Sequence, residues 1–305
     1  MTSRHAEALL FLENLAANPP QLPFEPSLLP ALFTYTSRDS DASMEAVADL
    51  VNRSQGLAVH VLRLANSAYY GLATKVSSLT RAMIILGMNE LRNLVLAYGA
   101  AAALKKFPLP PNFSVHTLWE HQVRTAIIAR ELGRIARDAA VDTQPAGPDE
   151  LYAAGLLHDL GKLIIASRRP HDWRSIHDLA AAENLPLITA EEQYWGIDHC
   201  TVGARLLSFW DIPPQLTELV SWHHTPQLAE FPYKAGVALL AAANTLADSG
   251  IRNKALAAGT LTARDIPPDI WKLLPQELHT EKTLTRLHTL FAHDAAAGKA
   301  DALTV

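Results

Sequence analysis

Apolar residues recur at three- and four-residue spacing along most of this chain, which is the pattern of amphipathic helices. The clearest example is 115–137, a long run with one apolar face. No stretch alternates polar and apolar residues over enough positions to indicate a strand of convincing length. Alanine is very common and glycine is low, at 14 of 305 residues, which also favours helix. The sequence therefore predicts an all-α protein.

The strongest break in these runs is 107–112, where three prolines occur within four residues. Proline removes a backbone donor and clashes with the preceding turn, so this segment cannot be helix interior. A chain of 305 residues is long enough for two helical lobes, each with its own core. We expect an N-terminal helical lobe at 1–112, a second helical bundle at 113–250 and a C-terminal helical extension at 251–305.

Capping residues, prolines and apolar spacing set the expected helix limits. Before the break, the expected helices cover 5–17, 26–33, 41–51, 56–68, 78–86 and 89–104. After it they cover 115–137, a helix from 148 to the pair 158–159, then 172–183, 187–194, 201–209, 213–223 and 233–247. The extension reads as helical, with a frayed end from 293.

Charge, cysteine content and hydropathy exclude several classes of protein. The formal net charge is −5 and no Lys or Arg block is longer than two residues, so we do not expect direct nucleic-acid binding. Cys200 is the only cysteine, which excludes an intramolecular disulfide and fits a reducing compartment. The N-terminus lacks the layout of a secretory signal, and the most apolar run, 94–104, is too short to span a bilayer. We expect a soluble cytoplasmic protein without membrane contact.

An adjacent histidine and aspartate, His158 and Asp159, end an apolar run that begins at Leu151. Neighbouring side chains on a helix diverge, so the pair can share one cation only where a helix end or kink turns them together. Gly161 would permit that irregularity. Lys162 adds a positive charge beside the pair, where an anion such as phosphate could bind. The alternative is a plain helix C-terminus with a solvated aspartate, a capping glycine and a solvated lysine.

Further histidines lie on stretches that predict separate helices, namely His121, His199 and the adjacent pair His223 and His224. Brought together in a bundle, imidazoles and a carboxylate suit a divalent transition metal such as Zn, Fe, Mn or Ni. Each also has an ordinary explanation: His121 as a half-buried side chain, and the His223–His224 pair as a cap at a helix C-terminus. We interpret Cys200 as a small buried residue.

Several segments together resemble a known family. They are 62–71 with 82–87, Leu118-Trp119-Glu120-His121, Ala154-Gly155-Leu156-Leu157-His158-Asp159-Leu160-Gly161-Lys162, and 196–199 with 202–207, Trp210 and His223-His224. Over roughly 22–247 the chain resembles the HDOD family, the HD-related output domains of bacterial signalling proteins. The resemblance implies that the second lobe is a helical bundle of the HD superfamily, which holds one or two metal ions.

The resemblance also implies roles for individual residues. His121 matches the first HD histidine, and His158 with Asp159 matches the defining pair. The remaining matches are to the extra ligands of the HD-GYP relatives, which hydrolyse cyclic di-GMP on a multinuclear metal centre: His199, His223 and His224. Together with Asn244, these residues are the expected metal-site residues.

Three positions depart from the HD pattern. The closing aspartate falls on Asn244, Thr117 stands where the hydrolases place a glutamate ligand, and Thr225-Pro226-Gln227 replaces their Gly-Tyr-Pro motif. A neutral amide oxygen is a poor ligand for a divalent ion, so losing both acids should weaken a hydroxide-bridged metal pair. A mononuclear site at the HD residues remains open, but activating a water for phosphodiester attack is then harder.

These departures favour a regulatory HDOD protein that acts through contacts with other signalling proteins, without catalysis, and that is gated by a bound metal or nucleotide. A metal-dependent phosphohydrolase acting on a nucleotide or cyclic dinucleotide is the second hypothesis, with Lys162 holding a phosphate. A scaffold with no ligand is the third.

Overall fold

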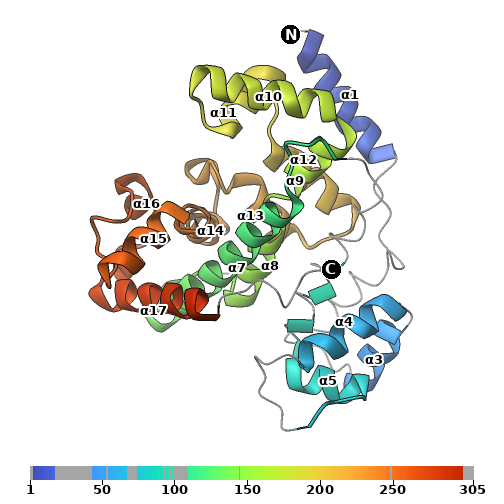
Figure 1. Ribbon diagram of the computed structural model, residues 1–305, viewed down its shortest axis with the longest axis vertical. Coiled ribbons are helices and arrows are strands. Elements are labelled where there is room, and N and C mark those ends of the chain that lie inside the picture. Colours follow the sequence, from blue (N-terminus) through green and yellow to red (C-terminus); the bar gives the residue numbers. More distant parts are fainter. Residues whose placement is uncertain are drawn as a thin grey trace.

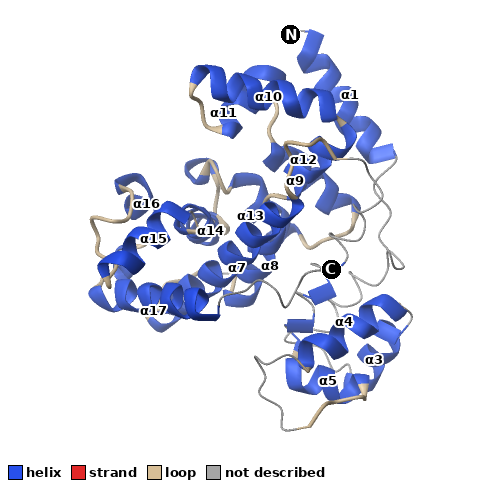
Figure 2. Cartoon of the chain, viewed as in Figure 1, coloured by secondary structure: helices blue, strands red, loops and turns tan. Residues whose placement is uncertain are grey.

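The structure, a computed structural model, describes residues 3–17, 43–52, 54–66, 74–88, 90–91, 94–95, 98, 109–143, 145–247 and 249–297. Every regular element in those residues is a helix, and no strand occurs among them (Figure 2). The predicted all-α class is therefore confirmed. Within the same residues, no helix combines the length and apolarity needed to cross a membrane.

The helices fall into three stretches of the chain. The N-terminal stretch contains α1 (Ser3–Ala17), α3 (Met44–Asn52), α4 (Gln55–Ala65) and α5 (Leu79–Leu86). The central stretch contains α7 (Val115–Asp138), α8 (Pro148–Leu157), α9 (Leu160–Arg168), α10 (Pro170–Glu183), α11 (Leu187–Trp195), α12 (His199–Phe209), α13 (Pro214–Trp222), the 3-10 turn η2 (Pro226–Leu228) and α14 (Lys234–Leu246). The C-terminal stretch contains α15 (Ser249–Ala258), α16 (Pro268–Leu273), the turn η3 (Gln276–Leu278) and α17 (Glu281–Ala297).

The helices gather into a small group and a larger bundle (Figure 1). The small group consists of α3, α4 and α5, which pack on one another. In the larger bundle α7 packs along α8 and against α14, and α12 packs against both α9 and α13. Helix α1 lies against α11 and α12, far from α3 to α5 in Figure 1. The side chain of His5 reaches the carbonyl of Trp195, with 3.0 Å between Nδ1 and the oxygen. The division of the chain at residue 112 stays a prediction.

Most helix limits lie within a few residues of the expected ones, with two informative differences. The helix predicted to end at 158–159 is followed at once by a second helix, α9, which was not expected. Helix α4 ends at Ala65, capped by Asn66, whose side chain bonds the carbonyl of Leu62 and both backbone groups of Val76. The expected helix at 26–33, most of 89–104, and the signature residues 67–71 lie outside the described residues.

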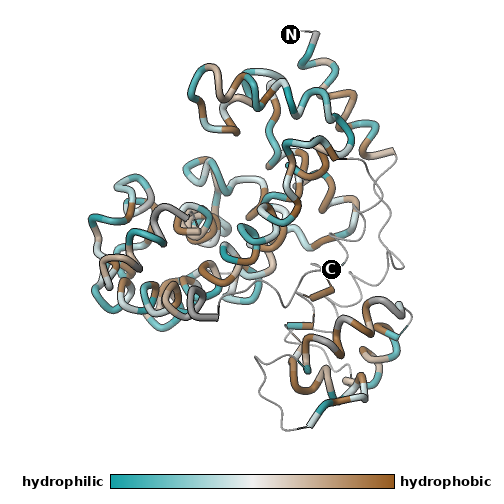
Figure 3. Tube along the Cα trace, viewed as in Figure 1, coloured by the Kyte–Doolittle hydropathy of each residue, from teal (hydrophilic) through white to brown (hydrophobic). Residues whose placement is uncertain are grey.

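Burial explains why the central helices form. Helix α8 is buried from Leu151 through Leu157, and α14 is buried along most of its length. Figure 3 shows hydrophobic stretches of the tube in the middle of the bundle. Helix α7 is amphipathic, with Ala129 and Leu132 in the core and Arg137 exposed. A buried apolar helix that ends in polar residues delivers those residues to the interior, and α8 does so at its C-terminus.

The C-terminal extension packs on the bundle. Arg286 of α17 bonds Glu131 and Asp138 of α7, at 2.7 Å from its Nε and 2.9 Å from its Nη1. Leu287 and Phe291, on the same helix, are buried. The extension therefore covers the outer face of α7.

Candidate metal centre

The chain turns at His158 and Asp159, between α8 and α9. Helix α8 ends at Leu157 and α9 begins at Leu160, so the pair lies at a junction of two helices. His158 keeps helical backbone angles, whereas Asp159 has φ −100° and ψ 10°. Both residues are fully buried. The turn aims both side chains at one region, because Nε2 of His158 lies 3.2 Å from Oδ2 of Asp159.

Two glycines flank this pair and let neighbouring helices approach it. A Cβ at Gly155 would lie 2.4 Å from the Cα of Ala126 on α7, and a Cβ at Gly161 would lie 1.9 Å from the carbonyl oxygen of His199 on α12. Such contacts leave no room for any larger residue. Gly161 is not among the glycines with positive φ, so the interpretation of Gly161 as a source of backbone freedom is wrong. It instead lets α12 carry His199 up to the His-Asp pair.

The first part of the site, which we name the HD half, comprises His121, His158, Asp159, Lys162 and Asn244. Nε2 of His121 on α7 lies 2.8 Å from Oδ1 of Asn244 on α14, in a hydrogen bond. The same nitrogen lies 3.7 Å from Oδ2 of Asp159. Nζ of Lys162 donates to that carboxylate oxygen at 2.7 Å. Lys162 thus neutralises a buried carboxylate, and its binding of an external anion stays a prediction.

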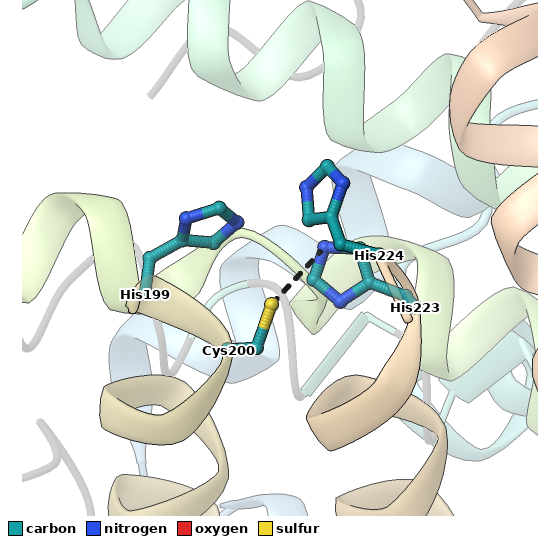
Figure 4. Close-up of side chains that lie close together, drawn as sticks. All are labelled: His199, Cys200, His223 and His224. Atoms are coloured by element: carbon teal, nitrogen blue, oxygen red, sulfur yellow. Dashed lines mark hydrogen bonds between the residues drawn. The ribbon is translucent and has the colours of Figure 1, made fainter. Parts of the chain in front are cut away.

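The second part, which we name the thiol half, comprises His199, Cys200, His223 and His224. His199 and Cys200 open α12, and the other two follow the end of α13. Figure 4 shows the four side chains gathered around one small region. Sγ of Cys200 lies 3.9 Å from Nε2 of His223, and the His199 and His224 ring centroids are 5.1 Å apart. Because α12 packs against α13, two segments more than twenty residues apart supply one cluster.

Asp159 joins the two halves. Its Oδ2 faces the HD half, whereas its Oδ1 lies 3.2 Å from Nε2 of His199 and 3.8 Å from Nε2 of His223. The His158 and His223 rings meet edge to face, with centroids 4.9 Å apart. A single carboxylate therefore faces imidazoles from both halves.

A buried carboxylate that sequence analysis missed, Glu191 of α11, holds His199 in place. Oε2 of Glu191 accepts hydrogen bonds from Nδ1 of His199 at 2.6 Å and from its backbone N–H at 2.9 Å. The carboxylate sits at the first residue of α12, where a helix N-terminus favours an anion. A carboxylate that orients the far nitrogen of an imidazole is typical of metal-binding histidines.

The sequence did carry a signal for Glu191. It lies on the apolar face of its helix, at the three- and four-residue spacing set by Leu187, Ala190, Tyr194 and Trp195. A charge on a buried face needs a partner, which here is His199. Neighbouring Glu192 points to solvent.

Three imidazoles are held in the same orientation. Nδ1 of His158 donates to the Gly155 carbonyl and Nδ1 of His223 donates to the Val220 carbonyl, each at 2.8 Å. His199 uses the same nitrogen for Glu191. A carbonyl oxygen only accepts, so Nδ1 carries the hydrogen and Nε2 of the neutral ring keeps a lone pair. This is the form in which histidine binds metal through Nε2.

The protonation of the HD half suits a cation. Burial lowers the pKa of His158 from 6.5 to about 4, so the ring is neutral at neutral pH. Burial likewise lowers the pKa of His121. Burial alone would raise the pKa of Asp159, but His158 and Lys162 beside it hold that pKa well below its usual value. The half therefore offers neutral imidazoles around an ionised carboxylate.

In the thiol half, the pKa of one imidazole is lowered and the pKa values of two others are raised. Burial lowers the pKa of His224 well below 6.5. Burial alone would also lower the pKa of His199, but the Glu191 carboxylate raises it well above 6.5. Burial opposes charging of His223 too, yet Cys200 and Asp159 raise its pKa to about 9. These imidazoles lie beside anionic groups and would exchange protons for a metal ion when one binds.

The site fits one or two transition-metal ions. Buried polar atoms without a hydrogen-bond partner in the described residues include Nε2 of His158, His199 and His224, and Oδ1 of Asp159. Each such atom costs about 1–3 kcal/mol when left unpaired. Two groups of ligand atoms, each within 4.8 Å of one another, are His121 with His158 and Asp159, and His199 with Cys200, His223 and His224. Nitrogen, thiolate and carboxylate donors together suit Zn or Fe.

Every residue expected at the metal site lies in this one cluster. They are His121, His158, Asp159, His199, His223, His224 and Asn244, with Lys162 beside them. Thr117, by contrast, is exposed, and both its backbone N–H and its hydroxyl bond the Ser114 side chain that caps α7. It places no side-chain ligand in the cluster.

Comparisons with known proteins agree with the resemblance to the HDOD family. A family model described as the HDOD domain matches residues 22–226. An HDOD domain protein with unknown function from Geobacter sulfurreducens is 25% identical with a TM-score of 0.72, over 98% of this chain and 100% of that one. A candidate phosphohydrolase from Shewanella amazonensis SB2B is 25% identical with a TM-score of 0.68, over 94% and 95%. An uncharacterized protein of Treponema pallidum (strain Nichols) is 25% identical over 204 residues, 67% of this chain but 38% of that protein, so the chain spans well under half of that relative.

Proposed function

The chain belongs to the HDOD family, and from that premise we propose that it is a regulatory signalling protein that acts through contacts with protein partners. In this proposal the buried histidine cluster binds a transition-metal ion that helps to fix the regulatory fold, and it does not turn over a phosphodiester. A reduced Cys200 in the cluster fits a cytoplasmic setting.

One observation carries this proposal: the position of the closing acid holds Asn244, and its amide oxygen already accepts a hydrogen bond from His121 at 2.8 Å. An aspartate there would add a negative charge and a strong ligand to the HD half. The amide supplies neither. Among the described residues, Asp159 is then the one carboxylate facing both halves, and Lys162 already neutralises part of its charge.

Charge explains why this arrangement opposes hydrolysis. Two divalent ions that share a hydroxide need anionic ligands to offset their charge, and the described cluster supplies Asp159 between its halves. Glu191 does not replace the missing acid, because its carboxylate lies behind His199 and bonds the far nitrogen of that ring. We therefore expect a metal to bind without forming an active hydroxide.

Access to the cluster also favours a regulatory role. The side chains of His158 and Asp159 are 0% and 1% exposed, whereas His121 and Lys162 keep 28% and 19%. A small ion can reach buried ligands, but a phosphodiester needs an open surface around the metal. A nucleotide phosphate that approached Lys162 would compete with Asp159 for the ammonium group.

The alternative is a metal-dependent phosphohydrolase acting on a nucleotide or cyclic dinucleotide. The likeness to the candidate phosphohydrolase of Shewanella amazonensis SB2B favours it, at a TM-score of 0.68 and near-complete coverage of both chains. In that case the cluster histidines and Asp159 would bind the metals, and Lys162 would hold a phosphate.

One activity screen distinguishes the regulatory function from the hydrolytic one. Wild type and Asn244→Asp are loaded with Mn²⁺ or Fe²⁺ and assayed against mononucleotides, which are phosphomonoesters, and against linear and cyclic dinucleotides, which are phosphodiesters. We expect no turnover by wild type, and a gain in Asn244→Asp would indicate that the amide alone blocks hydrolysis. Robust metal-dependent turnover by wild type that disappears in both His158→Ala and Asp159→Ala would overturn the proposal.

A further inference from the structure

The two halves of the site differ in how many ligand atoms are already engaged. In the HD half, His121 is bonded to Asn244 and Oδ2 of Asp159 is bonded to Lys162, which leaves Nε2 of His158 as the open ligand atom. In the thiol half, Nε2 of both His199 and His224 is buried and has no hydrogen-bond partner among the residues that the structure describes. Oδ1 of Asp159, the carboxylate oxygen that faces this half, has none either. An incoming ion must break the His121–Asn244 and Lys162–Asp159 bonds in the HD half. In the thiol half of the described structure, the hydrogen bond between candidate ligand atoms is the longer contact of Cys200 Sγ with His223 Nε2, at 3.9 Å.

The thiol half also has the dimensions of a tetrahedral site. Bonds of about 2.3 Å to sulfur and about 2.0 Å to nitrogen place tetrahedral ligand atoms roughly 3.3–3.6 Å apart. Sγ of Cys200 lies 3.9 Å from Nε2 of His223, and all four ligand atoms lie within 4.8 Å of one another. Inward movements of about 1 Å or less would close this group around an ion. Figure 4 shows the sulfur between His199 and His223, with a dashed line marking its hydrogen bond to His223.

We propose that the metal ion seats first in the thiol half, bound by Cys200 as a thiolate together with His199, His223 and His224. This inference rests on metal binding by the cluster, and it adds a ligand, Cys200, and an order of filling. On binding, one sulfur–metal bond and three nitrogen–metal bonds form, and the thiol proton leaves to solvent together with any second proton on the His199 and His223 rings. The HD half stays closed by its own His121–Asn244 and Lys162–Asp159 contacts.

The thiolate explains how a cluster without the closing acid can still hold a dication. It adds a negative charge to the one that Asp159 presents to the same half. Glu191 contributes a third from behind His199, through Nδ1. A soft sulfur ligand also selects among ions, favouring Zn²⁺ or Fe²⁺ over Mg²⁺ or Mn²⁺.

Cobalt tests the proposal directly, because Cys200 is the only cysteine in the chain. The full-length protein is stripped with chelator under reducing conditions and titrated with Co²⁺, whose visible bands report binding and whose near-ultraviolet charge-transfer band reports a bound thiolate. We expect the first equivalent to produce both. In Cys200→Ser the sulfur band should vanish, while binding by the remaining ligands weakens at least tenfold, on the order of the loss caused by removing a supporting partner.

Two further variants keep the test sharp. Cys200→Ala must lose the sulfur band as well, and thermal melts of both variants establish that they are folded. His121→Ala removes a ligand of the HD half only, so it should keep the sulfur band at full strength.

The outcomes separate this inference from the proposed function. Cobalt binding without a sulfur band in wild type overturns the role of Cys200 and leaves metal binding by the cluster standing. Loss of the band in His121→Ala, at retained folding, overturns the order of filling. Absence of any cobalt binding overturns both proposals.

Discussion

The HD half and the thiol half of this site use similar side chains and differ in what surrounds them. In the HD half, the amide of Asn244 and the ammonium of Lys162 already satisfy His121 and one oxygen of Asp159. In the thiol half, Glu191 supports His199 from behind and leaves its Nε2 without a hydrogen-bond partner in the described part of the chain. In the HD half, Nε2 of His158 is the ligand atom that stays open, whereas in the thiol half Nε2 of both His199 and His224 is open and the Cys200–His223 hydrogen bond is long, at 3.9 Å.

This difference shows that a motif alone does not fix where a metal binds. His158 and Asp159 are the most recognisable pair in the chain, yet Oδ2 of Asp159 already accepts a hydrogen bond from Lys162. Cys200, which belongs to no such motif, lies in the half where Nε2 of His199 and of His224 has no hydrogen-bond partner among the described residues. Ligand atoms are available only where neighbouring groups orient them without satisfying them.

The largest effect should follow from removing the carboxylate that joins the halves. Asp159→Asn leaves the Lys162 ammonium beside a neutral amide and deprives four imidazoles of their shared anion. Breaking a buried ion pair typically costs about 3–5 kcal/mol. We expect a loss of that order in the free energy of unfolding of the metal-free protein, measured by denaturant titration.

A matched substitution on the surface separates charge from position. Asp178 lies exposed on α10. Asp178→Asn should leave the unfolding transition where it is in wild type. Equal stability of the two variants would show that Asp159 does not hold the halves together.

Acid should destabilise the metal-free protein through His158. Its pKa is about 4 in the folded protein, against an ordinary 6.5. The unfolded chain therefore takes up a proton as pH falls below 6.5, and the folded protein does not until about pH 4. Stability is complete above 6.5 and is lost as pH falls through this window, by about 3 kcal/mol at roughly 1.4 kcal/mol per pKa unit.

The neighbouring histidines do not reverse this sign. His121 and His224, whose pKa values are also lowered, lose stability in the same direction. His199 and His223, whose pKa values are raised, are protonated in both states below 6.5 and do not contribute there. Denaturant midpoints measured in chelator from pH 7 to 4 check the slope. His158→Asn should flatten it, and an equally steep slope in that variant would contradict the assignment.

Removing the charge of Glu191 should weaken only the thiol half. Glu191→Gln loses the anion that orients His199, and losses of such partners typically lower metal affinity by 10–100-fold. The adjacent Glu192→Gln, at an exposed position, is the control and should bind Co²⁺ as wild type does. Competition titration with a chromophoric chelator measures both. Equal affinities in the two variants would remove Glu191 from the site.

The smallest expected effect is a gain in metal affinity when the HD half receives an anionic ligand. Asn244→Asp restores an anionic oxygen next to His121 and should raise metal affinity there by roughly tenfold, about 1.4 kcal/mol. A second Co²⁺ equivalent without any new sulfur band would report this gain. Unchanged stoichiometry would mean that Lys162 alone keeps the HD half closed.

Helical periodicity predicted the fold well because it depends on local spacing. The run 115–137 became α7 within one residue, and the proline at 148 begins α8. Helical periodicity could not predict α9, because a buried helix can start almost directly after the end of another buried helix. Nor could local spacing predict that α1 packs on α11 and α12, because that contact joins segments about 190 residues apart.

The candidate site was predictable to the extent that its residues carry motifs. The histidines and Asp159 were indicated by the residue pattern and given roles by the family resemblance. Glu191 was missed, and Cys200 was interpreted only as a small buried residue. Glu191 could have been found as a charge on the apolar face of α11. The role of Gly161 could not have been inferred from sequence. Its missing side chain lets the backbone of α12 approach, and that contact joins helices that are separated along the chain.

The central claim is that buried imidazoles, a thiol and one shared carboxylate form a metal centre. Anomalous diffraction from crystals of full-length protein, purified without chelator, tests it most directly. We predict a transition-metal peak among His199, Cys200, His223 and His224, within bonding distance of the sulfur. Absence of any peak at the cluster would contradict the metal centre, and a peak confined to His121, His158 and Asp159 would contradict the asymmetry between its halves.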